Sequence, residues 1–228
     1  VTRRDTPPLF GLGLLDNIPD LNILKKADPT DKNHDGISGR ANMIGGRVGR
    51  FGWKAQVVSL ADFSGDAYLN EMGITSPQFP NESAPQGGKV VCDTVADPED
   101  DGSNVAAFTD FMTLLAPLPV PQRPPADVRL GRGYFRRLRC NSCHMDNLKS
   151  GPSNVGPLSF KRVRVFSDLL LHDMGSLGDG IEQGDAKGGE FRTAPLWGVG
   201  KSAPYLHDGS AQTLEEAIAA HDGEGKAA

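Results

Sequence analysis

The sequence has few cysteines, no long apolar run and no excess of positive charge, and each shortage excludes a class of protein. Its three cysteines are too few for a zinc site built from closely spaced cysteine pairs. No apolar stretch approaches the roughly 20 residues of a membrane-spanning helix, so we expect no transmembrane segment. The formal net charge of -5 argues against nucleic acid and anionic membranes as partners.

Glycine and proline, by contrast, are abundant. The 28 glycines and 17 prolines together make up about a fifth of the chain, which is above average but below the range of disordered sequences. Hydrophobic residues account for 38% of the chain, and the mean hydropathy is -0.36. We therefore predict a soluble, mainly α fold with long irregular loops and little or no sheet.

Residues 140–144 have the sequence Cys-Asn-Ser-Cys-His, the C-x-x-C-H spacing of a c-type haem attachment site. In such a site two thiols add across the vinyl groups of one porphyrin, and the adjacent histidine reaches the iron. A redox dithiol or half of a zinc site would also contain C-x-x-C. However, Cys92 is isolated, and a helical pattern precedes the motif. We predict one haem c, tethered by Cys140 and Cys143, with His144 as the proximal ligand.

The segment 168–175, Asp-Leu-Leu-Leu-His-Asp-Met-Gly, offers two ligands for the other face of the iron. His172 and Met174 are two positions apart, so we expect only one of them to face the iron. A methionine thioether raises the potential of a haem, and a histidine lowers it. We predict Met174 as the distal ligand, with ordinary core packing as the alternative. His172 is then predicted to form a hydrogen bond near a haem propionate.

Two later histidines are interpreted as structural residues. The capping box Thr213-x-x-Glu216 opens a helix that has His221 on its apolar face, so His221 is expected to point inward or to lie at the haem edge. His207 lies in a glycine-bounded segment that we expect to form a tight loop. Inward histidines of this kind are more often satisfied by hydrogen bonds than bound to a metal.

An N-terminal segment resembles the first half of a calcium loop. Asp31, Asn33 and Asp35 alternate as oxygen ligands do, and the carbonyl of Ile37 would complete a short site. The twelfth position is Asn42 rather than glutamate, so a full EF-hand is not expected. The alternative is a surface turn rich in Asp and Asn.

Residues 47–54, Arg-Val-Gly-Arg-Phe-Gly-Trp-Lys, combine basic and aromatic side chains. We predict that Arg50 lies near the haem and pairs with a propionate. Trp53 would pack on the porphyrin or lie between redox centres, and plain core packing is the alternative. The acidic run at 97–101 is interpreted as a solvated surface, and a contribution to a calcium site is the alternative.

Prolines between residues 117 and 125 form the best candidate for a domain boundary. We predict an N-terminal lobe over 1–118, with the calcium loop, and a cytochrome c-like haem domain over 119–228. Apolar spacing predicts helices that begin after Ser59 and Ser103, and one over 127–138 that leads into the motif. The C-terminal segments around Phe191 and Tyr205 are predicted to be tight loops.

Several longer motifs occur in an order that resembles the bacterial di-haem oxidoreductase family, whose members are also called thiol oxidoreductases or peroxidases. The C-terminal half is similar to di-haem cytochrome c peroxidases. The resemblance implies an exported c-type cytochrome with two cytochrome-like lobes, and a methionine ligand is compatible with the position of Met174. The motifs are RDTPPLFGLG at 4–13, DGISGR at 35–40, GRFGWK at 49–54, EMGIT at 71–75, CNSCH at 140–144, SDLLLHDMG at 167–175, FRTAPLWG at 191–198 and YLHDG at 205–209.

The sequence departs from the family in one important respect. Members usually carry an earlier C-x-x-C-H, and this sequence has a single one. The segment around Cys92 is also poorer in cysteine than in the family, so no disulfide is predicted there. A di-haem peroxidase uses one six-coordinate haem to receive electrons and a second, open haem to cleave peroxide.

We therefore predict a periplasmic or otherwise exported electron-transfer protein that exchanges electrons with redox protein partners, with its signal peptide removed before Val1. One alternative is a peroxidase-like enzyme whose second haem comes from a missing segment or another chain. The other is a haem-bearing structural subunit of a larger electron-transfer assembly.

Overall fold

The computed structural model describes residues 2–84, 87–119 and 123–228. Helices make up 32% of the chain and strands 10%, which is compatible with a mainly α fold with little sheet, and the cytochrome c-like lobes stay a prediction. The helices are α1 (Leu12–Asp16), α2 (Asp20–Leu24), α3 (Leu60–Met72), α4 (Ser103–Leu114), α5 (Ala126–Arg137), α6 (Leu214–Ala219) and α7 (Glu224–Ala227). Short 3-10 turns are η2 (Cys140–Ser142), η3 (Gly156–Leu158), η4 (Gly175–Leu177) and η5 (Val199–Lys201).

The described strands pair as small antiparallel ribbons. They are β1 (Met43–Ile44) with β2 (Arg47–Val48), β3 (Leu148–Lys149) with β4 (Arg162–Val163), and β5 (Leu171–Asp173) with β6 (Glu190–Arg192). The prediction of a loop around Phe191 was wrong, because Phe191 lies in β6 opposite His172. Strand β6 is too short to show the alternating pattern of a strand, and its partner β5 is distant in the sequence.

Polar side chains fix the start of several helices. Ser59 accepts the N–H of Asp62 at 3.1 Å and caps α3, as predicted. The predicted capping box of α6 is also present. At α4 the cap is different from the prediction, because Asp100 accepts the backbone N–H groups of Asn104 and Val105, each at 3.2 Å. Asp100 is therefore buried at a helix end, and the acidic run is only partly a solvated surface.

The hydrophobic core draws on both sides of the proline-rich segment. Helix α4 packs against α1 and α3, and the isolated bridge from Arg40 to Leu171 joins the N-terminal region to β5. The boundary near residue 118 stays a prediction, and the middle of the predicted linker lies outside the described residues. The buried members of the core are Leu12, Leu15, Ile18, Ile23, Val48, Phe51, Leu60, Met112, Leu148, Val163, Val165, Leu169, Leu170 and Trp197.

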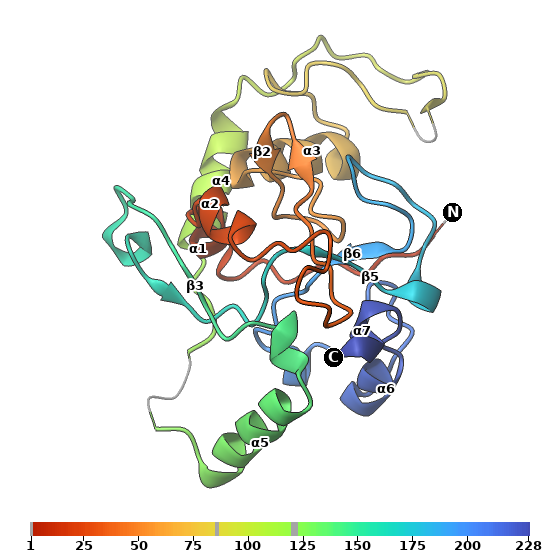
Figure 1. Cartoon of the computed structure of the whole chain (residues 1–228). Coiled ribbons are helices and arrows are strands. Elements are labelled where there is room, and N and C mark those ends of the chain that lie inside the picture. Colours follow the sequence, from red (N-terminus) through yellow and green to blue (C-terminus); the bar gives the residue numbers. More distant parts are fainter. Residues whose placement is uncertain (1, 85–86, 120–122) are drawn as a thin grey trace.

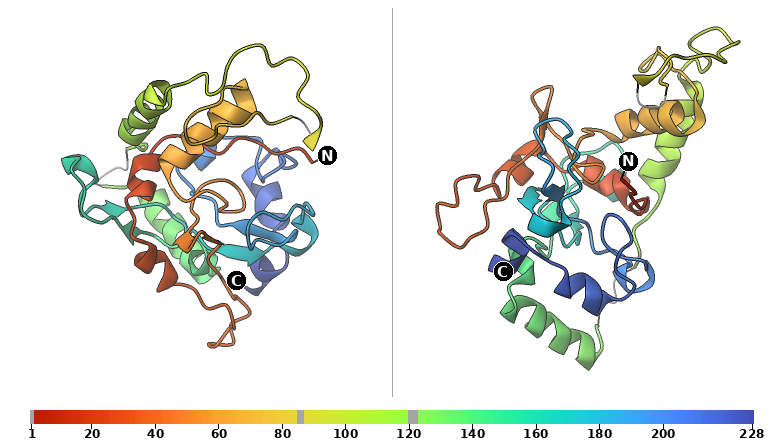
Figure 2. Two further views of the ribbon diagram at one scale, coloured as in Figure 1. Left: turned by 90° about the horizontal axis from the view of Figure 1, so that it is seen from above. Right: turned by 90° about the vertical axis from the view of Figure 1, so that its right-hand side faces the viewer.

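Two segments project from opposite ends of the molecule (Figure 1). One is the long excursion between α3 and α4, and the other is α5, which has no buried residue. Helices α6 and α7 lie at the same end as α5 in Figure 1 and in the right-hand view of Figure 2. None of the described helices combines the length and the apolar character needed to cross a bilayer.

A buried ion pair joins the N-terminal region to the C-terminal loops. The ammonium of Lys54 lies 3.1 Å from the carboxylate of Asp179, and these side chains are 0% and 1% exposed. Arg4 binds the same carboxylate at 2.6 Å. Burial lowers the pKa of Lys54, and the hydrogen bond to Asp179 opposes that shift. The two regions are thus joined by an ion pair between Lys54 and Asp179 that is almost fully buried.

Replacing Asp179 with asparagine should destabilise the chain by about 3–5 kcal/mol, because the ammonium of Lys54 would stay buried without a counter-charge. Arg3→Ala is the matched control. Arg3 is 78% exposed and 3.8 Å from Asp5, so its removal should cost about 0–1 kcal/mol. Urea unfolding measures both, and equal free energies of unfolding for the two variants would contradict the prediction.

Candidate functional site

Helix α5 leads directly into the C-x-x-C-H motif, as the sequence predicts. Arg139 follows α5 with a left-handed backbone, φ 59°, and this residue turns the chain into η2. The thiols of Cys140 and Cys143 are half-buried, and neither is part of a disulfide. Two free thiols on one tight turn have the spacing that covalent attachment to one porphyrin requires.

The imidazole of His144 is oriented by the backbone. Its Nδ1 lies 3.0 Å from the carbonyl oxygen of Phe166. Because a carbonyl can only accept, we assign the proton to Nδ1, which leaves the lone pair on Nε2 free. Burial lowers the pKa of His144, so the neutral ring is favoured. A neutral imidazole with its other nitrogen bonded to a carbonyl is the usual arrangement of a metal-ligating histidine.

The segment after the motif returns to pair with it. The N–H of Asp168 donates to the carbonyl of Cys143 at 3.0 Å, and the N–H of Ser167 donates to the carbonyl of Met145 at 3.1 Å. Phe135 of α5 and Phe166 pack edge-to-face with ring centroids 6.2 Å apart. These contacts place the run of leucines at 169–171, which is buried in the core, directly behind the motif.

His172 lies between two carboxylates and next to a cysteine of the motif. Its Nε2 is 3.0 Å from Asp168, its Nδ1 is 2.7 Å from Glu224, and the same Nδ1 is 3.7 Å from the Cys143 sulfur. Desolvation alone would lower the pKa of His172, but the hydrogen bonds to Asp168, Cys143 and Glu224 outweigh it and raise the pKa to about 12. A charged ring with both nitrogens engaged has no lone pair for a metal. The predicted contact of His172 with a propionate stays a prediction.

Glu224 extends this cluster to the N-terminal region. Its carboxylate accepts the backbone N–H of Ser38 at 3.1 Å and also binds the hydroxyl of that serine. Arg139 donates to the carbonyl of Ala227 at 2.9 Å. Helix α7 is therefore hydrogen-bonded to Arg139, the residue that precedes Cys140. Desolvation would raise the pKa of Glu224, but hydrogen bonds from His172 and Ser38 lower it to about 2.

Met174 lies just after β5 and is half-buried. Its backbone N–H donates to Gly189 at 2.9 Å. A Cβ atom placed on Gly225 would lie 3.4 Å from the Met174 methyl carbon and 3.3 Å from Cδ2 of His221. The carboxylate of Asp222 accepts the N–H of Ser176 at 3.0 Å, which fixes the two segments to each other. Met174 and His221 are therefore neighbours beside α7.

Helices α5 and α6 lie at one end of the molecule (Figure 1). Both expose apolar side chains. The exposed fractions are 61% for Leu130 in α5, 63% for Leu138 directly after α5, and 67% for Ile218 in α6. Leu130, Tyr134 and Leu138 are spaced four apart and share one helix face. An apolar surface next to two free thiols and an oriented imidazole fits the requirements of a haem.

Arg50 and Trp53 make contacts elsewhere. Arg50 is almost fully buried, and its guanidinium donates to the carbonyls of Asp16 and Ile18 and binds Asp20. Trp53 donates to the carbonyl of Asp5 at 2.7 Å and packs edge-on to His207. None of these contacts involves the C-x-x-C-H motif. The predicted roles of both residues beside haem stay predictions.

The carboxylates of the predicted calcium loop are engaged by the loop itself. Asp31 accepts the N–H groups of Asp35 at 3.0 Å and Gly36 at 3.1 Å, and Asp35 accepts that of Ile37 at 3.0 Å. Asn33 donates to Asp35 at 3.1 Å. This is the hydrogen bonding of an Asx-rich turn. The calcium site stays a prediction.

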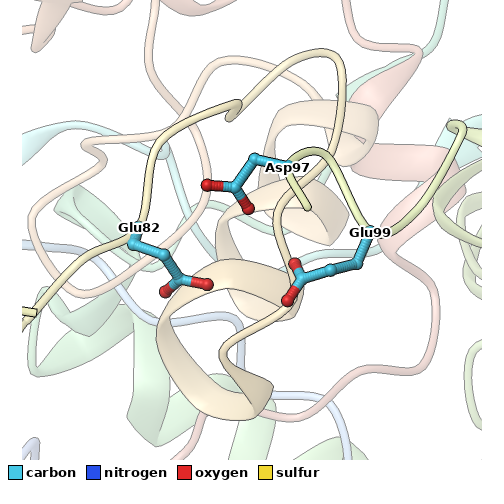
Figure 3. A group of neighbouring side chains, drawn as sticks. All are labelled: Glu82, Asp97 and Glu99. Carbon is cyan, nitrogen blue, oxygen red and sulfur yellow. The ribbon is translucent and has the colours of Figure 1, made fainter. Parts of the chain in front are cut away.

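A second acidic cluster lies in the excursion between α3 and α4. Glu82, Asp97 and Glu99 place carboxylate oxygens within 4.8 Å of one another (Figure 3). The hydroxyl of Thr75 donates to Asp97 at 2.5 Å or to Glu99 at 2.6 Å. The sequence favoured a solvated surface for residues 97–101, with a calcium site as the alternative, and gave no indication of Glu82. The clustering alone assigns no ligand.

The sequence of residues 1–228 matches the family described as "Di-haem oxidoreductase, putative peroxidase". The chain belongs to this family. No curated protein matches it. The match spans the whole chain, so it covers the N-terminal motifs as well as the C-x-x-C-H end. Membership of a di-haem oxidoreductase family implies a haem cofactor, which agrees with the donor set around His144.

The contribution of Glu224 to stability should depend on pH. Its folded pKa of about 2 is below the ordinary value of 4.5, so the contribution is present above about pH 4.5 and is lost as the pH falls towards 2. The stability difference between the wild type and Glu224→Gln should therefore be largest near neutral pH and shrink in acid. Urea unfolding from about pH 7 to about pH 3 measures it. The exposed Glu182→Gln is the control, and a parallel pH response in both variants would refute the prediction.

Proposed function

We propose that the chain is an exported c-type cytochrome that passes electrons through one covalently bound haem. The observation that carries this proposal is the hydrogen bond from His144 Nδ1 to the Phe166 carbonyl, which leaves Nε2 free beside two unpaired thiols. Cys140 and Cys143 tether the porphyrin, and His144 is the proximal ligand. Covalent haem is attached outside the cytoplasm, which is why we propose an exported protein.

The bound iron would supply a one-electron redox couple. The chain's own residues set the surroundings of that couple. Apolar side chains of α5 and α6 would cover the porphyrin and exclude water, and Phe135 and Phe166 support the His144 ring. In this proposal residues 119–228 act as a cytochrome c-like lobe, and the partners are redox proteins.

A peroxidase-like enzyme is the second candidate, because the family description includes peroxidase activity. Peroxide cleavage requires a haem with an open position and a nearby acid–base group. His172 is a poor acid–base group, since both its nitrogens are bound to carboxylates. The enzyme would therefore use a second haem, carried by another lobe or chain.

Covalent haem can be tested directly by mass. The chain purified from a bacterial periplasm with c-type haem maturation should carry the mass of one haem, which acidic acetone does not extract. Cys140→Ala combined with Cys143→Ala should abolish this adduct. Cys92→Ser is the matched control, because Cys92 is exposed and should be dispensable for attachment. Haem attachment that survives the double variant would contradict the proposal.

The electron-transfer and peroxidase proposals differ in their response to hydrogen peroxide. The single-haem chain should be reduced and reoxidised reversibly by small redox mediators, with no peroxide turnover above that of free haem. Stopped-flow absorption with a reduced cytochrome as electron donor measures this. Sustained peroxide consumption by the isolated single-haem chain would favour the enzyme and contradict electron transfer as its only role.

A further inference from the structure

We infer that His221, and not Met174, is the second axial ligand of the haem. The inference rests on the proposed function, because it assumes that the C-x-x-C-H motif binds haem with His144 as the first ligand. It replaces the sequence-based preference for Met174, which depended on the position of that residue in a leucine-rich segment.

The ring of His221 is held in the same way as the ring of His144. Its Nδ1 lies 2.8 Å from the carbonyl of Ala217, one turn earlier in the chain at the end of α6. The carbonyl can only accept, so Nδ1 carries the proton and Nε2 keeps its lone pair. A carbonyl bond to the far nitrogen fixes both the tautomer and the ring direction of metal-ligating histidines. Among the three histidines nearest the motif, His172 differs because carboxylates occupy both of its nitrogens.

The position of His221 also suits the role. Its Cβ and Cδ2 border Gly225 in α7, whose end is tied to Arg139 by the hydrogen bond at the Ala227 carbonyl. His221 is half-buried and therefore reachable by a cofactor that covers the apolar end of the molecule.

Met174 is the competing donor, and it is beside His221 rather than across the site from it. Its methyl carbon borders the same glycine, and the hydrogen bond from Ser176 to Asp222 holds the two segments together. The imidazole has a fixed direction before any cofactor binds, whereas a thioether on three rotatable bonds has none imposed by a hydrogen bond. Met174 is then a packing neighbour of the ligand. A haem with two histidine ligands has a lower potential than one with histidine and methionine.

The test uses the full chain with its haem attached in the periplasm, in the wild type and in the variants His221→Ala and Met174→Leu. His34→Ala is the control, because His34 is an exposed histidine in the Asp31 turn. Haem content is counted by mass, and the iron is examined by ferric EPR and by the far-red absorption band that a methionine sulfur gives with ferric haem.

The wild type, Met174→Leu and His34→Ala should be low-spin without the methionine band. His221→Ala should lose the low-spin signal, and added imidazole should restore it. If His221→Ala retains no haem, His221→Met decides the question, since it should gain the methionine band and a higher potential. A His221→Ala protein that stays low-spin, or a Met174→Leu protein that does not, overturns the inference while leaving haem binding intact. A wild-type chain without covalent haem overturns the proposed function itself, and the mass measurement shows which of the two has failed.

Discussion

The charged imidazole of His172 between Asp168 and Glu224 is the interaction on which the site depends. It is buried, and its partners come from the segment that pairs with Cys143 and from the last helix of the chain. Glu224 then binds Ser38, so a single carboxylate joins three distant parts of the sequence. Removing one partner of such a cluster leaves an uncompensated charge in the interior, which costs far more than an exposed ion pair. The position of α7 against the motif, and hence of the residues beside Gly225, follows from this cluster.

The proposed haem would explain why the apolar face of α5 is exposed. A helix whose leucines and tyrosine all face water gains little stability from its own sequence, because most helical stability comes from packing an apolar face. The hydrophobic core described above, which runs in sequence from Leu12 to Trp197, contains no residue of α5. A large apolar cofactor attached three residues after α5 would bury that face. The proposed haem therefore accounts for a stability problem as well as for the redox chemistry.

Local patterns in the sequence predicted the local features of the structure well. Ser59, the capping box at Thr213 and the helix before Cys140 act through residues a few positions away, so spacing alone identifies them. The pairing of β5 with β6 and the hydrogen bonds of the His172 ring join residues up to 52 positions apart. No short-range pattern encodes such contacts. Arg50 shows the same limit, because its buried contacts with the α1–α2 carbonyls are specified by the tertiary fold and not by its basic neighbours.

The choice between His221 and Met174 illustrates how a ligand becomes distinguishable only after folding. In the sequence both are single donors near the end of the chain, and His221 resembles an ordinary inward residue of a capped helix. In the structure the two lie beside one glycine, and only the imidazole has its free nitrogen defined by a backbone acceptor. Because folding of α6 already fixes the orientation of this ring, a haem iron bound by His221 would cost no further ordering of that side chain. A haem with an imidazole ligand on each face would have a lower reduction potential than a haem with histidine and methionine ligands. A lower reduction potential makes the reduced haem a better electron donor.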